Sequence, residues 1–416
     1  MPSPDPHNPV TILGAGIVGI CTALSLQEHG VPVTLVDRGA PGQETSMGNA
    51  GVVSPWSIIP QAMPGIWKKI PQLMFGYGRP LSIHPNIALK MVPWGLQFLR
   101  QGREDKVRAT AKAMSLLCDP SIELYQRHLA GTGHEDILID SAYVHAFRDG
   151  SRATLNSLDY RIRKEMGANL ELVGQDALLQ IEPALSRDFK AAVLIRDQAR
   201  VRSPGRLGQV LSQKAISQGA KFKQKNIRQL RQSGKEWEIV CDEENLKADR
   251  VVVCLGAWSP KLLEETALRV PLMAERGYHV QFRDPGIELN NSVMDVDAKV
   301  VASSMEGGVR VAGQAEFGPV DAPPNAKRKK QLVSVAQSAF PGVKTNQTSF
   351  WMGRRPSFPD SLPMLGPVQS LPGLFLNFGH SHYGLMMAPQ SGKLMSLMLT
   401  NRLQNADLSP FSPERF

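Results

Sequence analysis

The chain has 416 residues, of which 42% are hydrophobic and 20% charged, a composition typical of a globular protein with two or three domains. The four cysteines form no CxxC pair and no metal-ligand spacing, which argues against a disulfide scaffold and a metal site. The net charge of +9 is spread along the chain without a basic motif, so we expect no nucleic-acid partner.

The first predicted elements are a short apolar strand at 10–13, a helix over about 17–29 and a second strand at 33–36. A glycine-rich turn of the form GxGxxG, at 14–19, joins the first strand to the helix. This order of strand, glycine turn, helix and strand is typical of a dinucleotide-binding unit.

Each part of this unit has a physical task. Gly14 allows the tight turn, Gly16 lets a pyrophosphate approach the backbone, and Gly19 lets the helix lie against the strand. The free amides at the helix N-terminus attract the phosphates. An acid after the second strand accepts a hydrogen bond from a ribose 2′-OH. The predicted cofactor contacts here are Gly14, Gly16, Ile17, Val18, Gly19, Asp37 and Arg38.

A run of small and polar residues follows at 45–53 and reads TSMGNAGVV. Its glycines remove the Cβ atoms that would keep backbone amides from a flat ring. The run resembles the TSxxNAG segment of the D-amino-acid oxidase superfamily of flavoenzymes, most closely its bacterial D-amino-acid dehydrogenases. The resemblance implies FAD rather than a nicotinamide cofactor. It assigns to the cofactor Thr45, Ser46, Asn49, Ala50, Gly51 and Val53.

Three later blocks support the resemblance in the same order along the chain. VVVCLGAWS at 251–259 is similar to the family's strand followed by glycine, and GRRP at 353–356 to its GxRP segment. GHSHYG at 379–384 resembles its C-terminal flavin loop, and precedes a predicted helix at 386–399 whose dipole would stabilise a reduced flavin. The resemblance covers about 10–399. It adds the cofactor contacts Ile227, Gly256, Ala257, Gly353, Gly379, His380, Tyr383, Gly384 and Leu385.

The FAD is expected to be non-covalent. The sarcosine-oxidase branch of the superfamily attaches its flavin to a cysteine near the GxRP block, and residues 350–363 contain none. His380 is better interpreted as a polar residue at the flavin edge than as an attachment point.

The resemblance also implies three catalytic residues, Arg355, Tyr278 and His382. Arg355 would bind a substrate carboxylate, because a planar guanidinium donates two parallel hydrogen bonds to it. Alternation along a strand would point its neighbour Arg354 the other way. Tyr278 would close the pocket over the substrate, with an ordinary half-buried sheet tyrosine as the alternative. His382 departs from the smaller residues usual in the flavin loop and would reshape the substrate side.

The segment 52–103 is predicted to be a basic, apolar insertion. Residues 45–103 contain no Asp or Glu, although the composition would place about five there. Prolines divide the segment into apolar pieces, such as 66–75 and 87–99, that are too short to span a bilayer. Basic pieces that contain tryptophan suit a membrane interface. We therefore predict peripheral membrane contact, with an ordinary insertion packed on the protein as the alternative.

The predicted fold class is α/β (α+β), with a Rossmann-like FAD/NAD(P)-binding domain interleaved with a substrate domain. The cofactor domain is expected at 1–56, 198–260 and 353–416. The substrate domain is expected at 57–197 and 261–352, around a mixed, largely antiparallel sheet.

The resemblance implies oxidation of D-amino acids to 2-oxo acids and ammonia, by hydride transfer from Cα to flavin N5. The electrons would pass to a quinone or a dye-like acceptor. Alternatives are an oxidase or dehydrogenase of glycine, sarcosine or cyclic imino acids such as D-hydroxyproline, and a flavoprotein electron-transfer subunit. The expected location is the cytoplasm, with contact to the inner face of the bacterial cytoplasmic membrane. The oligomeric state is left open.

Overall fold

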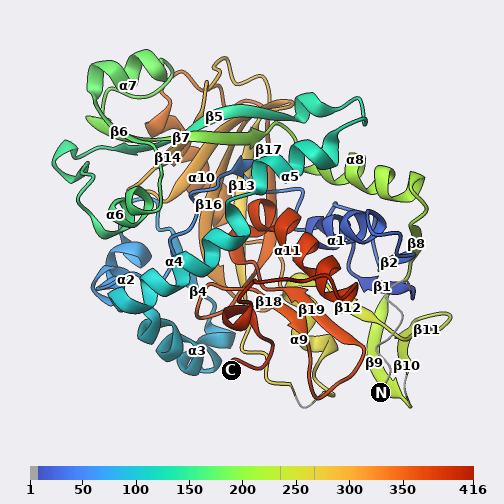
Figure 1. Cartoon of the computed structure of the whole chain (residues 1–416). Coiled ribbons are helices and arrows are strands. Elements are labelled where there is room, and N and C mark those ends of the chain that lie inside the picture. The colour runs from blue at the N-terminus through green and yellow to red at the C-terminus, as the bar shows by residue number, and fades with distance from the viewer. Residues whose placement is uncertain (1–7, 235, 267) are drawn as a thin grey trace.

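The structure is a computed structural model that describes residues 8–234, 236–266 and 268–416 (Figure 1). Its strands form two large sheets, sheet A and sheet B, and one small three-stranded sheet. Helices surround both large sheets, so the predicted mixed α/β fold class is confirmed.

Sheet A has six strands, and all neighbours in it are parallel except the outermost pair. Strand β1 and its neighbours are almost entirely apolar, as expected for parallel strands covered on both faces. In spatial order the strands are β18 (Met364–Pro367), β19 (Leu374–Phe378), β12 (Val251–Val253), β1 (Val10–Leu13), β2 (Val33–Asp37) and β8 (Lys221–Gln224).

Sheet B has ten strands and is largely antiparallel, with parallel pairs only at β14–β5 and β16–β4 among the described strands. Its main path is β17 (Thr348–Ser357), β13 (Met273–Phe282), β16 (Gly308–Phe317), β15 (Val300–Met305), β14 (Ser292–Asp295), β5 (Leu138–Phe147), β7 (Ala191–Val201) and β3 (Val52–Val53). Two further strands, β4 (Leu81–Ile83) and β6 (Leu170–Gly174), pair with β16 and β7.

The helices and the small sheet complete the described chain. The helices are α1 (Ile17–Gln27), α2 (Ile66–Phe75), α3 (Ala88–Gln101), α4 (Glu104–Cys118), α5 (Ser121–Leu129), α6 (Leu158–Glu165), α7 (Gln175–Ile181), α8 (Pro204–Ser217), α9 (Ser259–Leu262), α10 (Lys327–Ala339) and α11 (Gly384–Leu399). The small sheet consists of β9 (Ile227–Ser233), β10 (Glu236–Cys241) and β11 (Leu246–Ala248).

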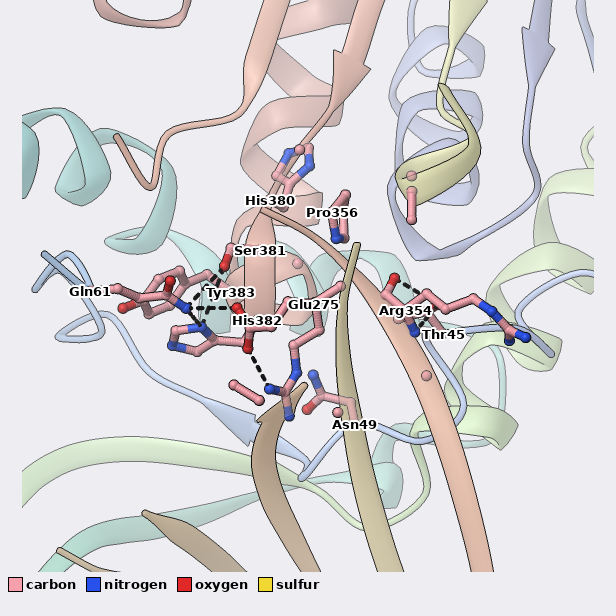
Figure 2. Close-up of a pocket in the computed structure, with 18 of the residues that line it drawn as sticks. Thr45, Asn49, Gln61, Glu275, Arg354, Pro356, His380, Ser381, His382 and Tyr383 are labelled. Atoms are coloured by element: carbon pink, nitrogen blue, oxygen red, sulfur yellow. Dashed lines mark hydrogen bonds and ion pairs between the residues drawn. The ribbon is translucent and has the colours of Figure 1, made fainter. Parts of the chain in front are cut away.

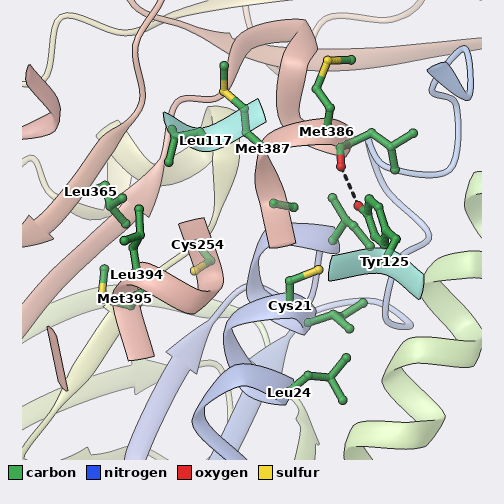
Figure 3. Packing of buried hydrophobic residues seen from close by; sticks show 14 of the residues in the cluster. Cys21, Leu24, Leu117, Tyr125, Cys254, Leu365, Met386, Met387, Leu394 and Met395 are labelled. Atoms are coloured by element: carbon green, nitrogen blue, oxygen red, sulfur yellow. Dashed lines mark hydrogen bonds between the residues drawn. The ribbon is translucent and has the colours of Figure 1, made fainter. Parts of the chain in front are cut away.

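Helices α1 and α11 pack against each other in the largest hydrophobic core (Figure 3). Gly392 allows this approach, because a Cβ atom there would lie 2.7 Å from the backbone of Cys21. Tyr125 of α5 joins the two helices to the neighbouring layer, and its hydroxyl donates to the carbonyl of Leu385 at 2.6 Å. The first and last parts of the chain therefore form one core under the glycine-rich turn.

The predicted elements of the N-terminal unit are confirmed with small changes at their ends. Helix α1 ends at Gln27, because the chain turns at Gly30, where φ is +72°. Strand β12 is two residues shorter than the apolar run at 251–255, and α11 begins at Gly384 rather than at 386. The division into domains by residue range stays a prediction. Residues 52–53, 198–201 and 353–357, which it assigns to the cofactor domain, are strand residues of sheet B.

The segment 52–103 forms helices α2 and α3, which lie together at one edge of the molecule (Figure 1). Helix α2 buries none of its side chains, and α3 buries only Trp94. The Trp94 ring lies 5.2 Å from Phe317 of sheet B, which fixes α3 on the protein. Within the described ranges, no helix combines the length and apolarity needed to cross a bilayer.

Candidate active site

Three parallel strands of sheet A end at the mouth of a large cavity of about 1620 Å³. Each strand, β1, β12 and β19, is followed by a glycine with positive φ: Gly14 at 109°, Gly256 at 56° and Gly379 at 95°. Only glycine adopts such angles without strain. Open α/β sheets bind ligands at the carboxyl ends of their strands, so the position of this cavity is that of a ligand site.

The glycine-rich turn has the close contacts that its sequence predicts. A Cβ atom at Gly14 would lie 2.5 Å from the carbonyl oxygen of Cys254, and one at Gly19 would lie 2.0 Å from that of Gly14. A Cβ atom at Gly16 would meet only the Ser46 hydroxyl, at 3.5 Å, so this backbone is open to the cavity. The Ile17 amide donates to Ser46 at 3.0 Å, which brings the small-residue run to the helix N-terminus.

Asp37, at the end of β2, is bound to the glycine-rich turn. One carboxylate oxygen accepts the Ala15 amide at 2.7 Å, and the other accepts the Gly39 amide at 3.1 Å. Each oxygen can accept a further hydrogen bond, and the carboxylate lines the cavity. Next to it, the Arg38 guanidinium lies 4.3 Å from the centre of the Trp258 ring.

Residues 45–51 cross from sheet A to sheet B and are held by the backbone and side chains of sheet B. The Thr45 hydroxyl accepts the amide of Arg354 and donates to its carbonyl, both at 3.2 Å. Arg310 donates to the Asn49 carbonyl at 2.8 Å. Only glycine fits at position 48, because a Cβ atom there would lie 1.9 Å from the ring of Trp351.

All but three of the residues predicted from the sequence line this one cavity. Gly19 lies behind the turn, Gly51 faces the backbone of Val201, and Val53 is buried in β3. Those that line it are Gly14, Gly16, Ile17, Val18, Asp37, Arg38, Thr45, Ser46, Asn49, Ala50, Ile227, Gly256, Ala257, Tyr278, Gly353, Arg355, Gly379, His380, His382, Tyr383, Gly384 and Leu385.

Arg355 forms an ion pair with a buried glutamate, Glu275. The two residues are directly opposite each other on β17 and β13, and Nη1 of Arg355 lies 2.7 Å from Oε1 of Glu275. The same Nη1 donates to the Gln314 carbonyl at 2.9 Å. The guanidinium lies over Gly277, where a Cβ atom would be 2.3 Å from its central carbon. The chain thus holds this arginine flat against sheet B, facing the cavity.

Arg354 points away from Glu275, as the alternation along the strand predicts (Figure 2). Its Nε donates to the Val320 carbonyl at 2.6 Å, and its guanidinium lies 5.4 Å from the centre of the Trp258 ring. Because Arg38 lies over the same ring, Arg354 is on the cofactor-binding side of β17.

Glu275 is the acceptor of a buried network that includes His382 (Figure 2). Its second oxygen accepts the Ser357 hydroxyl at 3.0 Å and the Gln61 amide at 3.1 Å. Burial acts to raise the pKa of Glu275, but the Arg355 charge and the donated hydrogen bonds outweigh it, so the pKa lies below its usual value. The side chain of Glu275 is therefore ionised at pH 7.

The same network determines the tautomer of His382. The Gln61 amide nitrogen lies 2.9 Å from Nδ1 of His382, and its orientation is set by the acceptor-only Glu275 carboxylate. Nδ1 is then the acceptor and Nε2 carries the proton. Burial, and less strongly the Arg355 charge, lower the pKa of His382 to about 4, although Glu275 opposes the shift. His382 is neutral at pH 7.

Tyr278 is more buried than the sequence predicts. Only 1% of its surface is exposed, its ring stacks on Phe350 at 5.6 Å, and its hydroxyl donates to Glu316 at 3.2 Å. These contacts favour the alternative of an ordinary sheet tyrosine. His380 is also buried and bonds Ser391 at 3.1 Å, and burial lowers its pKa to about 3.

Three residues of the site are absent from the sequence-based prediction: Glu275, Gln61 and Ser357. The sequence gives a weak signal for Glu275, an acid directly before Arg276 in a run of mostly apolar residues at 270–282. Gln61 had none, because it lies in a proline-rich loop whose partners come from distant strands.

Known proteins are similar to this chain over almost its whole length. The family described as DAO, FAD dependent oxidoreductase, matches residues 9–398. A D-amino-acid oxidase of Bradyrhizobium diazoefficiens is 34% identical, and the match covers 98% of each chain. A D-amino acid dehydrogenase of Rhizobium rhizogenes is 30% identical, over 98% of this chain and 99% of its own. Glycine oxidase from Geobacillus kaustophilus has the same fold, with a TM-score of 0.75 at 21% identity over 99% of each chain.

FAD is the cofactor, as the sequence predicts, and the residues present fit it. The backbone at Gly16 is open to the cavity, where a Cβ atom would meet only the Ser46 hydroxyl, and the Asp37 carboxylate lines the cavity beside it. The turn would hold the pyrophosphate, and Asp37 the adenosine ribose.

Replacing Asp37 should weaken FAD retention. Asp37→Ala removes a charged acceptor, and a hydrogen bond to a charged group contributes about 1.5–3 kcal/mol, so we expect FAD to dissociate at least about tenfold more readily. Asp37→Asn keeps one acceptor oxygen and should lose less. FAD content after gel filtration and titration of the apoprotein measure this, with Glu171→Ala, on the surface of sheet B, as the control. Unchanged FAD affinity would remove Asp37 from this role.

Proposed function

The chain belongs to the DAO family of FAD-dependent oxidoreductases, and from that premise we propose that it oxidises D-amino acids to 2-oxo acids and ammonia. The observation that carries the proposal is the orientation of Arg355. The names of the curated relatives, D-amino-acid oxidase and D-amino acid dehydrogenase, at 30–34% identity, support the same substrate class.

The guanidinium of Arg355 uses one nitrogen for contacts within the protein and has one edge free for a ligand. Nη1 is used by Glu275 and Gln314, and Nη2 has only a long contact of 3.5 Å with the Gly313 carbonyl. Nε has no hydrogen-bond partner in the described parts of the chain. The edge formed by Nε and Nη2 therefore suits the two oxygens of a carboxylate.

The remaining groups prepare the site for an amino acid. Glu275 balances the charge of Arg355, so the pair is neutral before the substrate binds. His382, with its proton on Nε2, donates a hydrogen bond but does not take the ammonium proton, which must leave to water. The residues thus orient the substrate rather than react with it, and orientation supplies about 7–11 kcal/mol in well-aligned systems.

Bound FAD supplies the hydride acceptor for the Cα hydrogen, so the chemistry needs no side-chain nucleophile. We propose that the FAD is held without a covalent bond. The four cysteines are buried, and Cys254, which lines the cavity, lies at the glycine turn beside Gly14.

We further propose that α2 and α3 contact an anionic membrane surface and that a quinone accepts the electrons there. The two helices expose large apolar side chains, including Phe75 at 74% and Leu89 at 88%, beside Lys68 and Lys90. Exposed apolar and basic side chains together are the features of an interfacial helix. The cavity continues between these helices, where its lining is apolar: Ile70, Leu73, Met91, Leu96 and Phe98.

The visible spectrum of the purified holoprotein tests the substrate class. Anaerobic addition of a D-amino acid should bleach the flavin band, and its L-enantiomer should not. Slow recovery in air with rapid recovery on adding a quinone supports the dehydrogenase, and rapid recovery in air indicates an oxidase. Bleaching by sarcosine or D-proline but by no primary D-amino acid would contradict the proposal.

Arg355→Ala should raise the KM for amino acids about tenfold to hundredfold or more, because the charged hydrogen bonds to the substrate carboxylate are lost. FAD should remain bound. The matched control is Arg354→Ala, the neighbouring arginine on the cofactor side of the strand, which should leave the KM unchanged. An unchanged KM for Arg355→Ala would remove this residue from substrate binding.

Neutralising Lys68, Lys90 and Arg100 with glutamine should weaken binding to vesicles of phosphatidylglycerol. Each basic residue near an anionic surface contributes about 1 kcal/mol, so we expect a loss of about a hundredfold in cosedimentation. The control variant replaces Lys221, Lys223 and Lys247 with glutamine. These lysines are also exposed and lie outside α2 and α3. Equal effects of the two triple variants would contradict docking through α2 and α3.

A further inference from the structure

The cavity extends along sheet B beyond Arg355, and a lysine without a partner lies in its far part. Lys299 ends the turn between β14 and β15, where its amide donates to the Asp295 carbonyl at 2.9 Å and its φ is +54°. Its Nζ makes no hydrogen bond or ion pair with any residue that the structure describes. The side chain is accessible and lines the cavity, although protein surrounds it closely enough that burial lowers its pKa.

The groups around Lys299 are mainly cationic or hydrogen-bond donors. Lys69 of α2 and Arg152 line the same part of the cavity and act on Lys299 as like charges. The nearby acids are already paired, Asp159 with Arg163 at 3.4 Å and Asp297 with Arg152. An excess of positive charge therefore remains here.

Two strand residues add polar atoms that lack strong hydrogen-bond partners. The Tyr143 hydroxyl has only the sulfur of Met294, at 3.6 Å, which is a weak acceptor. His145 bonds Tyr160 through Nδ1 at 2.8 Å, and its buried Nε2 has no partner among the described residues. We name these residues the distal cationic pocket: Lys69, Tyr143, His145, Arg152 and Lys299.

One glycine of β16 lies between the guanidinium of Arg355 and the backbone of Lys299. Gly313 of β16 has its carbonyl 3.5 Å from Nη2 of Arg355. On its other side, a Cβ atom at Gly313 would lie 2.7 Å from the carbonyl oxygen of Lys299. The side chains of Arg355 and Lys299 both line the same cavity.

We propose that the distal cationic pocket binds a carboxylate on the substrate side chain, so that the preferred substrates are acidic D-amino acids. Their α-carboxylate binds Arg355 and their second carboxylate binds Lys299. This inference rests on the proposed function of the site. A substrate with a cationic side chain would be repelled by this pocket, and one with a neutral side chain would leave Lys299 without a partner.

The binding test uses the holoenzyme and inert acids. Glutarate, a dicarboxylate, should perturb the flavin spectrum at about tenfold to hundredfold lower concentration than butyrate. Lys299→Met should abolish this difference and leave butyrate binding unchanged, whereas Lys299→Arg should retain it. Lys261→Met is the matched control, a lysine that lines the cavity at its cofactor end. Equal affinity of glutarate and butyrate in the unaltered enzyme would overturn the proposal.

The kinetic test compares D-glutamate with D-glutamine, which has the same shape without the charge. D-glutamate should have at least a tenfold higher kcat/KM, and Lys299→Met should lower this ratio to about one without changing the value for D-alanine. Reduction by D-alanine with no preference for D-glutamate would overturn the inference alone. Absence of reduction by every D-amino acid would overturn the proposed function, and the glutarate measurement would still decide the role of the pocket.

Discussion

The ion pair between Glu275 and Arg355 organises the substrate end of the molecule. A carboxylate buried at this depth is stable only with a charged partner and several donors, and Arg355, Ser357 and Gln61 supply them. The pair fixes the plane of the guanidinium. Through Gln61 it also determines which nitrogen of His382 carries the proton. The buried Glu275 carboxylate thus sets the orientation of Arg355, Gln61 and His382, which line the cavity.

Glycines make this arrangement possible where backbone or flat groups must approach closely. Gly277 leaves the space in which the guanidinium of Arg355 lies, and Gly48 leaves the space for the ring of Trp351. The turn at Gly14 and Gly16 does the same for the cofactor. Sheet A provides the cofactor end, and sheet B provides a wall of charged side chains opposite it.

The cavity is therefore different at its three ends. Its cofactor end is made of backbone amides and glycines, and its far end on sheet B is cationic around Lys299. A third part of its lining is mainly apolar and comes from α2 and α3, whose outer faces are exposed. This division offers separate positions for the FAD, the substrate and the electron acceptor that we propose.

The sequence by itself determined the parts of the protein that depend on local chain geometry. The strand, glycine turn and helix at 10–27 follow from residue spacing, and the structure has them. The same spacing predicts the opposite directions of Arg354, which bonds Val320, and Arg355, which pairs with Glu275. The sequence also predicts that segment 52–103 is basic and apolar, and its helices α2 and α3 expose apolar side chains. Only the tertiary structure decided the pairing of Glu275 with Arg355 and the position of Lys299 in the same cavity. Those contacts join strands far apart in the chain, and their register depends on the whole of sheet B, which no local pattern specifies.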